Sequence, residues 1–406
     1  MDFTDSPAVA AFRTECRAWL EANAAPAHPT DGASIALLDP GLDDETVVAR
    51  ARAWQTRAAA DGWAGIGWPR AFGGRGASLV EQVVFAQEAA HFDVPDHVFR
   101  IGITMAGPTI IAHGTDEQRA RWLPPMLTGE EIWCQLFSEP GAGSDLAALR
   151  TTAERDGDAW VVNGQKVWSS GAHYSRWGML LARTDLDAPK HRGITYFGLD
   201  MDTPGVDIRP LRQMTGGSHF NEVFLTDVRV PDAHRIGEAN GGWGVAQTTL
   251  LHERASVGDL LGEGRVARGL GALAHQAEVA GRRGAHDARV RQELAAIHTE
   301  EQILRYLMMR VVTAFALGRL PGPEASVAKL AMARLLNRAG AAALALDPEA
   351  ALTGVGPWAE LFLAAPAVRI AGGSDEIQRN IVGERVLGLP REPGPPPETP
   401  FRDLPA

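Results

Sequence analysis

Hydrophobic and polar positions follow two different periods along the chain. Over residues 1–133, apolar residues recur with the helical period, and Gly/Pro-rich stretches such as GIGWPRAFGGRG separate the segments. Ser6 is followed by Pro7, as at many helix starts. Ser78 is followed three residues later by Glu81, the spacing of a capping box. This part is therefore predicted to form an N-terminal all-α domain.

The period changes to that of β-strands over residues 134–236. The dipeptides Asp156-Gly157 and Asn163-Gly164 stand between short β-prone runs, and such dipeptides favour hairpin turns. GITYFGLDM, VDIRPL and FNEVFLTDVRVP add further strand-like runs. We expect a compact middle domain of antiparallel strands with a barrel-like shape.

The helical period returns over residues 237–391, where apolar side chains form one stripe on each long segment. Long helices of this kind usually pack as an antiparallel bundle, so a C-terminal four-helix bundle is predicted. Residues 392–406 (EPGPPPETPFRDLPA) contain too many prolines for a helix and are expected to form an extended arm. The predicted fold class is thus α+β, with several domains.

Composition excludes several classes of function. The net charge of −11, without a stripe of Lys or Arg, argues against nucleic-acid binding. No apolar run approaches the roughly 18 residues that span a membrane, and the N-terminus does not resemble a signal peptide. The two cysteines, Cys16 and Cys134, and the twelve histidines lack metal-ligand spacing. We expect a soluble cytoplasmic protein with reduced thiols and no metal.

One segment at the boundary between helical and β patterns indicates a ligand site. In WCQLFSEPGAGSDLAALR, Gly141 and Gly143 let the backbone turn sharply and leave its N–H groups accessible. Ser138 and Ser144 place hydroxyl groups on either side of this turn. Such a loop suits the close approach of a polar planar or phosphorylated ligand.

Within this segment, SEPGAGSD resembles the signature of the acyl-CoA dehydrogenases. NGQKVWSSGA (163–172), FNEVFLTDVRVP (220–231) and GGSDEIQRNIVGERVLGLPR (372–391) resemble further motifs of the family in the same order. The resemblance extends from Trp63 to Arg391. It implies a flavoprotein oxidoreductase of lipid metabolism that binds FAD and an acyl-CoA and is usually a tetramer.

The resemblance also implies roles for individual positions. Hydroxyl and main-chain N–H groups would bond the flavin edge, and the indole of Trp168 would cover its flat ring. Ser144 would border the thioester or the pantetheine of the substrate. The positions that match cofactor contacts are Gln135, Phe137, Ser138, Trp168, Ser170, Arg282, Ser374 and Glu376.

The family reaction requires a carboxylate that removes the α-proton of the thioester. In the commonest members this carboxylate precedes Gly-Thr in the C-terminal motif, but here that position is Gly372. Glu253 matches the position that supplies the base in isovaleryl- and long-chain-type members, and is our candidate base. The adjacent Arg254 is assigned to the substrate, and His252 is a rival base. The N–H of Gly372 is expected to polarise the thioester oxygen.

Two family motifs that contact FAD across a subunit interface are incomplete. The Arg-x-x-Phe-Gly run retains only Arg282, and in place of Gln-x-x-Gly-Gly only Gly354 and Gly356 remain. Within the family, such losses accompany bulky or branched acyl groups and, in some cases, assembly from two different subunits. We therefore expect a homotetramer or dimer, or a heterotetramer with a related subunit, with an electron-transfer flavoprotein or similar acceptor.

The leading hypothesis is α,β-dehydrogenation of an acyl-CoA, or an acyl-carrier-protein thioester, to the trans-2-enoyl product. The acyl group is expected to be branched, long or bulky, by analogy with the subfamilies that carry the base on this helix. One alternative is a related oxidase or monooxygenase. The other is a non-catalytic partner subunit in a heteromeric dehydrogenase.

Overall fold

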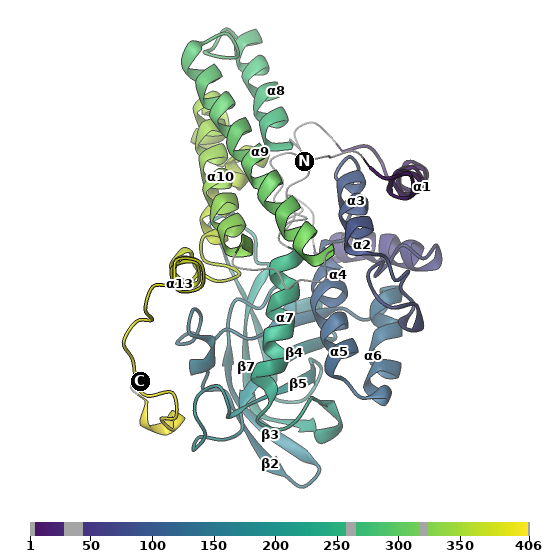
Figure 1. Cartoon of the computed structure of the whole chain (residues 1–406), viewed down its shortest axis with the longest axis vertical. Coiled ribbons are helices and arrows are strands. Elements are labelled where there is room, and N and C mark those ends of the chain that lie inside the picture. Colours follow the sequence, from purple (N-terminus) through teal and green to yellow (C-terminus); the bar gives the residue numbers. More distant parts are fainter. Residues whose placement is uncertain (1–4, 28–43, 257–264, 317–323, 405–406) are drawn as a thin grey trace. The chain divides into compact units, whose positions relative to one another are not determined.

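The structure is a computed structural model that describes residues 5–27, 44–256, 265–316 and 324–404 (Figure 1). The chain divides into two compact units. The first comprises residues 1–42, 76–94 and 254–390, and the second residues 43–75, 95–253 and 391–406. No helix in the described ranges is long and apolar enough to cross a membrane.

In the described part of the second unit, an eight-stranded sheet has the strand order β6-β7-β3-β2-β4-β5-β8, with β1 paired to β4. Most neighbours are antiparallel, which confirms the predicted β domain. The β1–β4 pair is parallel, because the long chain between these two strands returns to the same end of the sheet. The strands are β1 (Trp133–Leu136), β2 (Thr152–Asp156), β3 (Ala159–Lys166), β4 (Trp177–Arg183), β5 (Ile194–Asp200), β6 (Val206–Leu211), β7 (Phe220–Pro231) and β8 (Arg235–Ile236).

The two predicted hairpin turns have different outcomes. Asp156 pairs with Ala159 across a tight turn between β2 and β3, as expected. Asn163 and Gly164, however, lie inside β3, at a shift in its register with β7. A Cβ atom at Gly164 would lie 2.3 Å from the hydroxyl of Thr151. The second turn prediction was therefore wrong, because this glycine serves a bulge with a close backbone approach.

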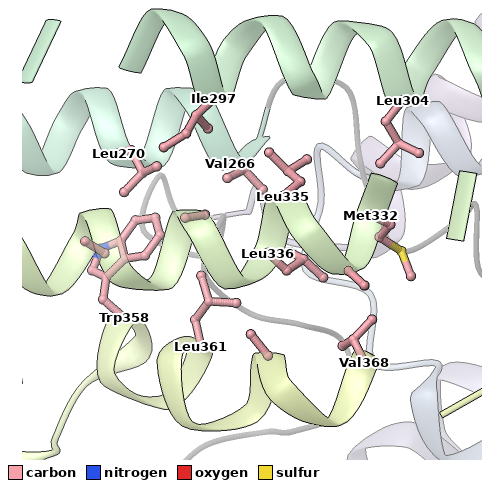
Figure 2. Close-up of a cluster of buried hydrophobic side chains, with 14 of the residues drawn as sticks. Val266, Leu270, Ile297, Leu304, Met332, Leu335, Leu336, Trp358, Leu361 and Val368 are labelled. Atoms are coloured by element: carbon pink, nitrogen blue, oxygen red, sulfur yellow. The ribbon is translucent and has the colours of Figure 1, made fainter. Parts of the chain in front are cut away.

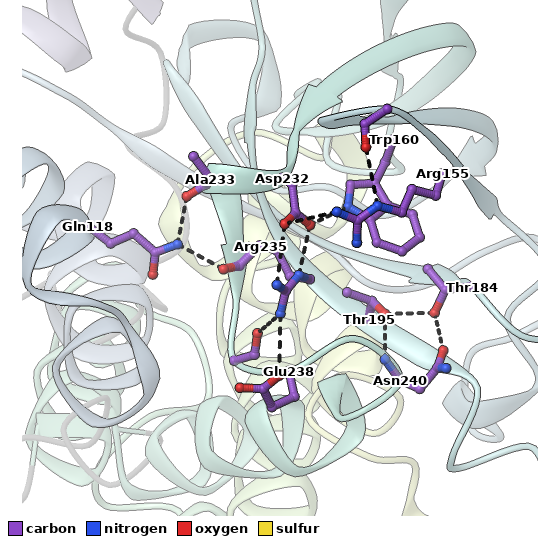
Figure 3. Close-up of polar contacts among 12 residues, drawn as sticks. Gln118, Arg155, Trp160, Thr184, Thr195, Asp232, Ala233, Arg235, Glu238 and Asn240 are labelled. Atoms are coloured by element: carbon purple, nitrogen blue, oxygen red, sulfur yellow. Dashed lines mark hydrogen bonds and ion pairs between the residues drawn. The ribbon is translucent and has the colours of Figure 1, made fainter.

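Helices accompany the sheet in the second unit, and one of them is tied to its edge by a side chain. Gln118 lies in the first turn of α6, and its Nε2 donates to the carbonyls of Ala233 and Arg235, both at 2.8 Å (Figure 3). The amide thus joins α6 to the chain around β8. The helices of this unit are α2 (Asp44–Ala60), α4 (His97–Ile101), α5 (Gly107–His113), α6 (Asp116–Thr128) and α7 (Gly242–Ser256), of which α7 belongs to it up to Glu253.

Asp232 joins β3 to the same edge of the sheet. It accepts hydrogen bonds from Arg235 Nε at 2.9 Å and from Trp160 Nε1 at 2.7 Å (Figure 3). The Arg235 guanidinium and the Trp160 indole hold the pKa of Asp232 at about 2. The carboxylate therefore stays charged over the whole physiological range and fixes the end of β7.

A π-helical turn, η3 (Gly102–Ala106), connects α4 to α5. The indole Nε1 of Trp68 donates to the carbonyl of Ile103 in this turn, at 2.9 Å. The ring of Trp68 fills the space that Gly107 leaves, because a Cβ atom at Gly107 would lie 2.0 Å from it. The missing side chain at Gly107 thus lets the tryptophan pack against the helix.

The first unit is helical in its described part. The two predicted caps are confirmed: Ser6 Oγ accepts from Val9 N, and Ser78 and Glu81 form both hydrogen bonds of a capping box. The helices are α1 (Pro7–Asn23), α3 (Leu79–Ala89), α8 (Arg265–Val279), α9 (Ala288–Ala316), α10 (Glu324–Leu346), α11 (Pro348–Thr353), α12 (Pro357–Val368) and α13 (Asp375–Arg385).

Four of these helices share one hydrophobic core (Figure 2). Helix α10 packs against α8, α9 and α12, and its apolar stripe supplies the largest part of the core. This arrangement confirms the predicted C-terminal helical domain. The labelled core side chains are Val266, Leu270, Ile297, Leu304, Met332, Leu335, Leu336, Trp358, Leu361 and Val368.

We expect Gly107→Ala to lower the free energy of unfolding by about 1–3 kcal/mol, because the added methyl group must displace the rigid ring of Trp68. The matched control is Gly271→Ala in α8, where no atom lies within 4 Å of the added Cβ. There we expect a gain of about 0.5–1 kcal/mol from the better helix former. Urea unfolding measures both, and equal effects of the two substitutions would contradict the packing argument.

Candidate active site

The segment that follows β1 carries several predicted ligand contacts. Gln135 lies in β1, and Phe137 and Ser138 follow the end of the strand. The buried ring of Phe137 packs edge-on against Tyr196 of β5, with 5.9 Å between the ring centroids. The carbonyl of Ser138 accepts from Val167 N at 2.9 Å. This hydrogen bond places the segment beside the loop that follows β3.

A buried ion pair fixes this pairing of segments. Lys166, at the end of β3, has no exposed side-chain surface, and its Nζ lies 2.7 Å from Oε1 of Glu139. The same Nζ donates to the carbonyl of Phe137 at 3.1 Å. Glu139 also accepts from the backbone N–H groups of Arg150 and Thr151, at 2.6 and 2.9 Å. Both charged groups of the pair thus form hydrogen bonds with the backbone at the two ends of the SEPGAGSD loop.

The surroundings of Glu139 decide its ionisation state. Burial by itself would raise the pKa of this carboxyl, but Lys166, Thr151 and the backbone N–H of Arg150 outweigh burial and hold the pKa below its ordinary value. Glu139 is therefore ionised near neutral pH and accepts all its hydrogen bonds as a carboxylate.

The loop after β3 combines an exposed indole with a strained backbone. Trp168 adopts a left-handed conformation with φ of 62°, and its side chain is 60% exposed. Such a conformation costs a residue other than glycine about 1–2 kcal/mol, and strain of this kind concentrates at ligand sites. The neighbouring Ser169 has a buried Oγ without a hydrogen-bond partner among the described residues. Because β3 ends at Lys166, Trp168 and Ser170 lie in the loop after the strand.

Glu253 lies in α7 beside the first of these segments. Gln135 Nε2 donates to Glu253 Oε2 across 3.5 Å, a long hydrogen bond. One turn earlier on the same face of α7, the hydroxyl of Thr249 lies 2.9 Å from Thr109 Oγ1 and 3.2 Å from the hydroxyl of Tyr196. These buried contacts orient α7, and with it the face that carries Glu253, toward the sheet.

His252 and Arg254 stand on either side of Glu253 in the sequence. Burial lowers the pKa of His252, which favours the neutral imidazole. The side chain of Arg254 lies outside the described residues. Ser144 is exposed in the loop that Glu139 anchors, where its hydroxyl is accessible to a ligand.

In the first unit, the C-terminal motif forms a turn of two glycines before α13. Gly372 and Gly373 have φ of 65° and 87°, a region that L-residues with side chains rarely adopt. Ser374 caps α13, and Glu376 is exposed in its first turn. Gln378 Nε2 donates to the carbonyl of Gly372 at 2.9 Å. The absence of a side chain at Gly372 therefore agrees with its backbone conformation.

Asp375 anchors this turn, and the sequence analysis did not single it out. Its buried carboxylate accepts from Arg369 Nε at 2.8 Å and lies 3.4 Å from Lys329 Nζ. Arg282, predicted to contact the cofactor phosphate, lies in the connection between α8 and α9, and its guanidinium donates to the carbonyl of Leu346. Its charge is thus partly engaged within the same unit.

The predicted site residues therefore fall into two groups. One group belongs to the second unit, where hydrogen bonds join β1 and the residues that follow it to the loop after β3 and to α7. In the first unit, Gly372, Ser374 and Glu376 lie at the start of α13, whereas Arg282 lies elsewhere, on the carbonyl of Leu346. Sequence reasoning missed Glu139, Lys166 and Gln378, although all three stand inside the motifs that carried the resemblance.

Comparisons with known families give one consistent result over nearly the whole chain. The profile described as "Acyl-CoA dehydrogenase, N-terminal domain" matches residues 6–130, that of the middle domain residues 134–228, and that of the C-terminal domain residues 240–387. Acyl-CoA dehydrogenase IpdE1 of Mycobacterium tuberculosis is 41% identical over 393 residues, which cover 94% of this chain and 98% of that protein.

Solved structures show the same fold. The "Tcur3481-Tcur3483 steroid ACAD" superposes with a TM-score of 0.82 at 29% identity and covers 97% of this chain and 100% of that one. The ChsE4–ChsE5 complex of Mycobacterium tuberculosis has a TM-score of 0.78 at 30% identity, with the same coverage. Both similarities extend across all three domains of the fold.

We expect Lys166→Met to lower the free energy of unfolding by about 3–5 kcal/mol, because it leaves the carboxylate of Glu139 buried without its counter-ion. The double substitution Glu139→Gln/Lys166→Met should be less damaging than Lys166→Met alone. Since the folded-state pKa of Glu139 is lowered, its contribution is complete above the ordinary carboxyl pKa and is lost as the pH falls through the folded value.

Urea unfolding of the variants between about pH 3 and pH 7 measures both effects, because this range spans the ordinary carboxyl pKa. Glu154→Gln, at an exposed position of β2, is the matched control and should change little. If Lys166→Met lowers the free energy of unfolding no more than the control does, the Glu139–Lys166 ion pair does not hold the loop.

Proposed function

Because the chain belongs to the acyl-CoA dehydrogenase family and is an enzyme of that class, we propose that it converts an acyl-CoA thioester to the trans-2-enoyl-CoA with FAD and with Glu253 as base. The observation that carries this assignment is the contact of Glu253 with Gln135, on the strand that leads into the SEPGAGSD loop. Gly372, the alternative position, has no side chain and a backbone that disfavours one.

The residues present suit a flavin. The exposed indole of Trp168 offers a flat apolar surface, and its backbone is strained, as is common at ligand sites. The buried Oγ of Ser169, without a partner among the described residues, offers a hydrogen bond to a ligand. Gln135, Phe137, Ser138 and Ser170 would complete the contacts in the second unit. In the first unit, Ser374 and Glu376 are the candidates for the ribityl or phosphate part. Bound FAD would supply the acceptor for the β-hydrogen of the substrate.

The chain itself would manage the α-proton. Glu253 is half-buried in α7 and would act as the general base that takes this proton. The amide of Gln135 donates to Oε2 of this carboxylate and would orient it toward the substrate. The backbone N–H of Gly372 needs no side chain to stabilise negative charge on the thioester oxygen. Gln378 would hold the peptide of Gly372 through its carbonyl.

We infer that the acyl group is branched, long or ring-bearing. One solved relative is described as a steroid ACAD, and the position of the proposed base agrees with subfamilies that accept bulky groups. The electron acceptor would be an electron-transfer flavoprotein or a similar protein. The thioester carrier, CoA or acyl-carrier protein, stays open in this proposal.

The active form is proposed to be an oligomer, either of identical chains or with a related subunit. Two solved relatives are described as complexes of two different chains. In the first unit, several large apolar side chains are exposed and suit burial against another chain: Leu352, Val355, Ile370, Val386 and Leu387. The incomplete interface motifs of the sequence are consistent with a partner that supplies the missing FAD contacts.

A second candidate function is that of a non-catalytic partner subunit. It is favoured by the absence of a carboxylate at Gly372 and by the engagement of Arg282 with the Leu346 carbonyl. The intact SEPGAGSD loop and the Glu139–Lys166 ion pair that holds it favour the catalytic proposal instead. The two candidates differ in whether the chain itself reduces a flavin in the presence of a thioester.

We expect Glu253→Gln to retain FAD but to slow anaerobic bleaching of the flavin by an acyl-CoA at least about a hundredfold, because general-base catalysis contributes on that order or more. Stopped-flow absorbance of the flavin is the measurement. His252→Asn tests the rival base, and Glu238→Gln, at an exposed position before α7, is the matched control. Unchanged bleaching in Glu253→Gln, or a larger loss in His252→Asn, would reject the assignment.

A panel of straight, branched, cyclic and steroid-like acyl-CoAs should bleach the flavin at different rates, with the bulky thioesters fastest. The difference is expected because a pocket shaped for a large acyl group gains less binding energy from a thin acyl chain.

A purified polypeptide that is colourless alone and binds FAD only with a related subunit would favour the partner function. Bleaching by short straight-chain thioesters alone would contradict the substrate class.

A further inference from the structure

The C-terminal segment, residues 391–404, does not hang free but ends against the β domain of the second unit (Figure 1, yellow). The N–H of Phe401 donates to the carbonyl of Ala188 at 3.0 Å. The N–H of Arg402 donates to the carbonyl of Leu186 at 3.1 Å. The expected extended arm thus adds a short stretch of backbone to the loop between β4 and β5 and closes with a single helical turn, η8 (Phe401–Asp403).

Ion pairs reinforce this attachment on both sides. Arg402 Nε lies 2.6 Å from Asp187 in the loop. Glu398, earlier in the segment, pairs with Arg192 at the other end of the same loop. Exposed pairs of this kind contribute little energy each, so their main effect is to fix the register of the segment on the loop.

Phe401 supplies the buried part of the attachment. Its ring is only 5% exposed and faces the guanidinium of Arg183, 3.8 Å from the ring centroid. Arg183 is itself 2% exposed and donates to the carbonyls of Lys190 and Ala147, at 2.7 and 2.6 Å. Without Phe401, one face of this guanidinium would meet water, which would compete for its hydrogen bonds.

Arg183 connects the segment to the SEPGAGSD loop. Ala147 lies three residues after Ser144, in the turn that leads from this loop toward β2. Lys190 also pairs with Asp145, the last residue of the motif, at 2.7 Å. Besides Glu139, which accepts from the N–H of Arg150, Arg183 and Lys190 thus hold the turn 144–150. Both of these residues contact the part of the structure that the C-terminal segment covers.

We propose that residues 396–404 form a strap, with Phe401 as a positioning residue that holds Arg183 and, through it, the turn after Ser144. A general anchor would stabilise the whole chain evenly. A strap acts on the two segments that Arg183 joins, the turn 144–150 and the loop 185–192. The difference between these two effects is measurable without any ligand.

Hydrogen–deuterium exchange of the full-length protein tests the strap. Phe401→Ala should speed exchange of amides in residues 145–150 and 186–190 about tenfold, the equivalent of a lost cation–π contact, and leave α8–α10 unchanged. Phe401→Leu keeps apolar cover and should give a smaller effect. Truncation after Pro390 should reproduce Phe401→Ala, and Glu392→Ala, in the exposed part of the segment, should change nothing. Unchanged exchange in both segments, or a rise spread evenly over the chain, overturns the strap.

The consequence for turnover rests on the proposed function. If Ser144 borders the thioester, Phe401→Ala should raise KM for the acyl-CoA about tenfold while kcat changes by less than about twofold, because binding is affected rather than proton transfer. If amide exchange in the two segments is faster but KM is unchanged, the strap is supported and the placement of Ser144 at the substrate is wrong. A fall in kcat with constant KM would overturn the positioning role.

Discussion

The buried ion pair between Glu139 and Lys166 is the constraint on which the site in the second unit depends. A lysine without exposed surface stays charged only if a counter-ion and further acceptors replace its water, and Glu139 with the Phe137 carbonyl does so. The same carboxylate holds two backbone N–H groups at the far end of the loop. One pair thus closes the SEPGAGSD loop and joins it to the end of β3, beside Trp168. The strain of Trp168 persists because its surroundings are fixed in this way.

The two places where the family could keep its base differ in backbone physics. Gly372 adopts a left-handed conformation that a glutamate would occupy only with strain, and its carbonyl is held by Gln378. Glu253 lies in regular helix on a face oriented by the buried hydroxyls of Thr249, Thr109 and Tyr196. A helix fixes the direction of a side chain better than a turn of two glycines does. The proposed relocation therefore moves the carboxylate to a more rigid support.

Much of the fold could be predicted from the sequence because local signals were strong. The caps at Ser6 and Ser78 and the turn after Asp156 follow from hydrogen bonds within a few residues. The turn predicted at Asn163-Gly164 was wrong because Gly164 accommodates the close approach of Thr151. No local pattern encodes this tertiary contact. The parallel β1–β4 pair and the contact of Phe401 with Arg183 join segments that are distant in the sequence. Local patterns therefore could not predict them either.

The candidate site was predictable only in part. The motifs indicated Gln135, Ser138 and Trp168 as candidates but not the Glu139–Lys166 pair, because the sequence does not reveal that a charged pair inside a motif is buried. The central claim, that Glu253 removes the α-proton, is tested most directly by a thioester without β-hydrogens, which loses its α-proton but transfers no hydride. The account predicts that the flavin-loaded protein exchanges the α-hydrogens of this thioester with solvent deuterium, as seen by NMR, and that Glu253→Gln abolishes the exchange. Exchange at the unaltered rate in Glu253→Gln would contradict it.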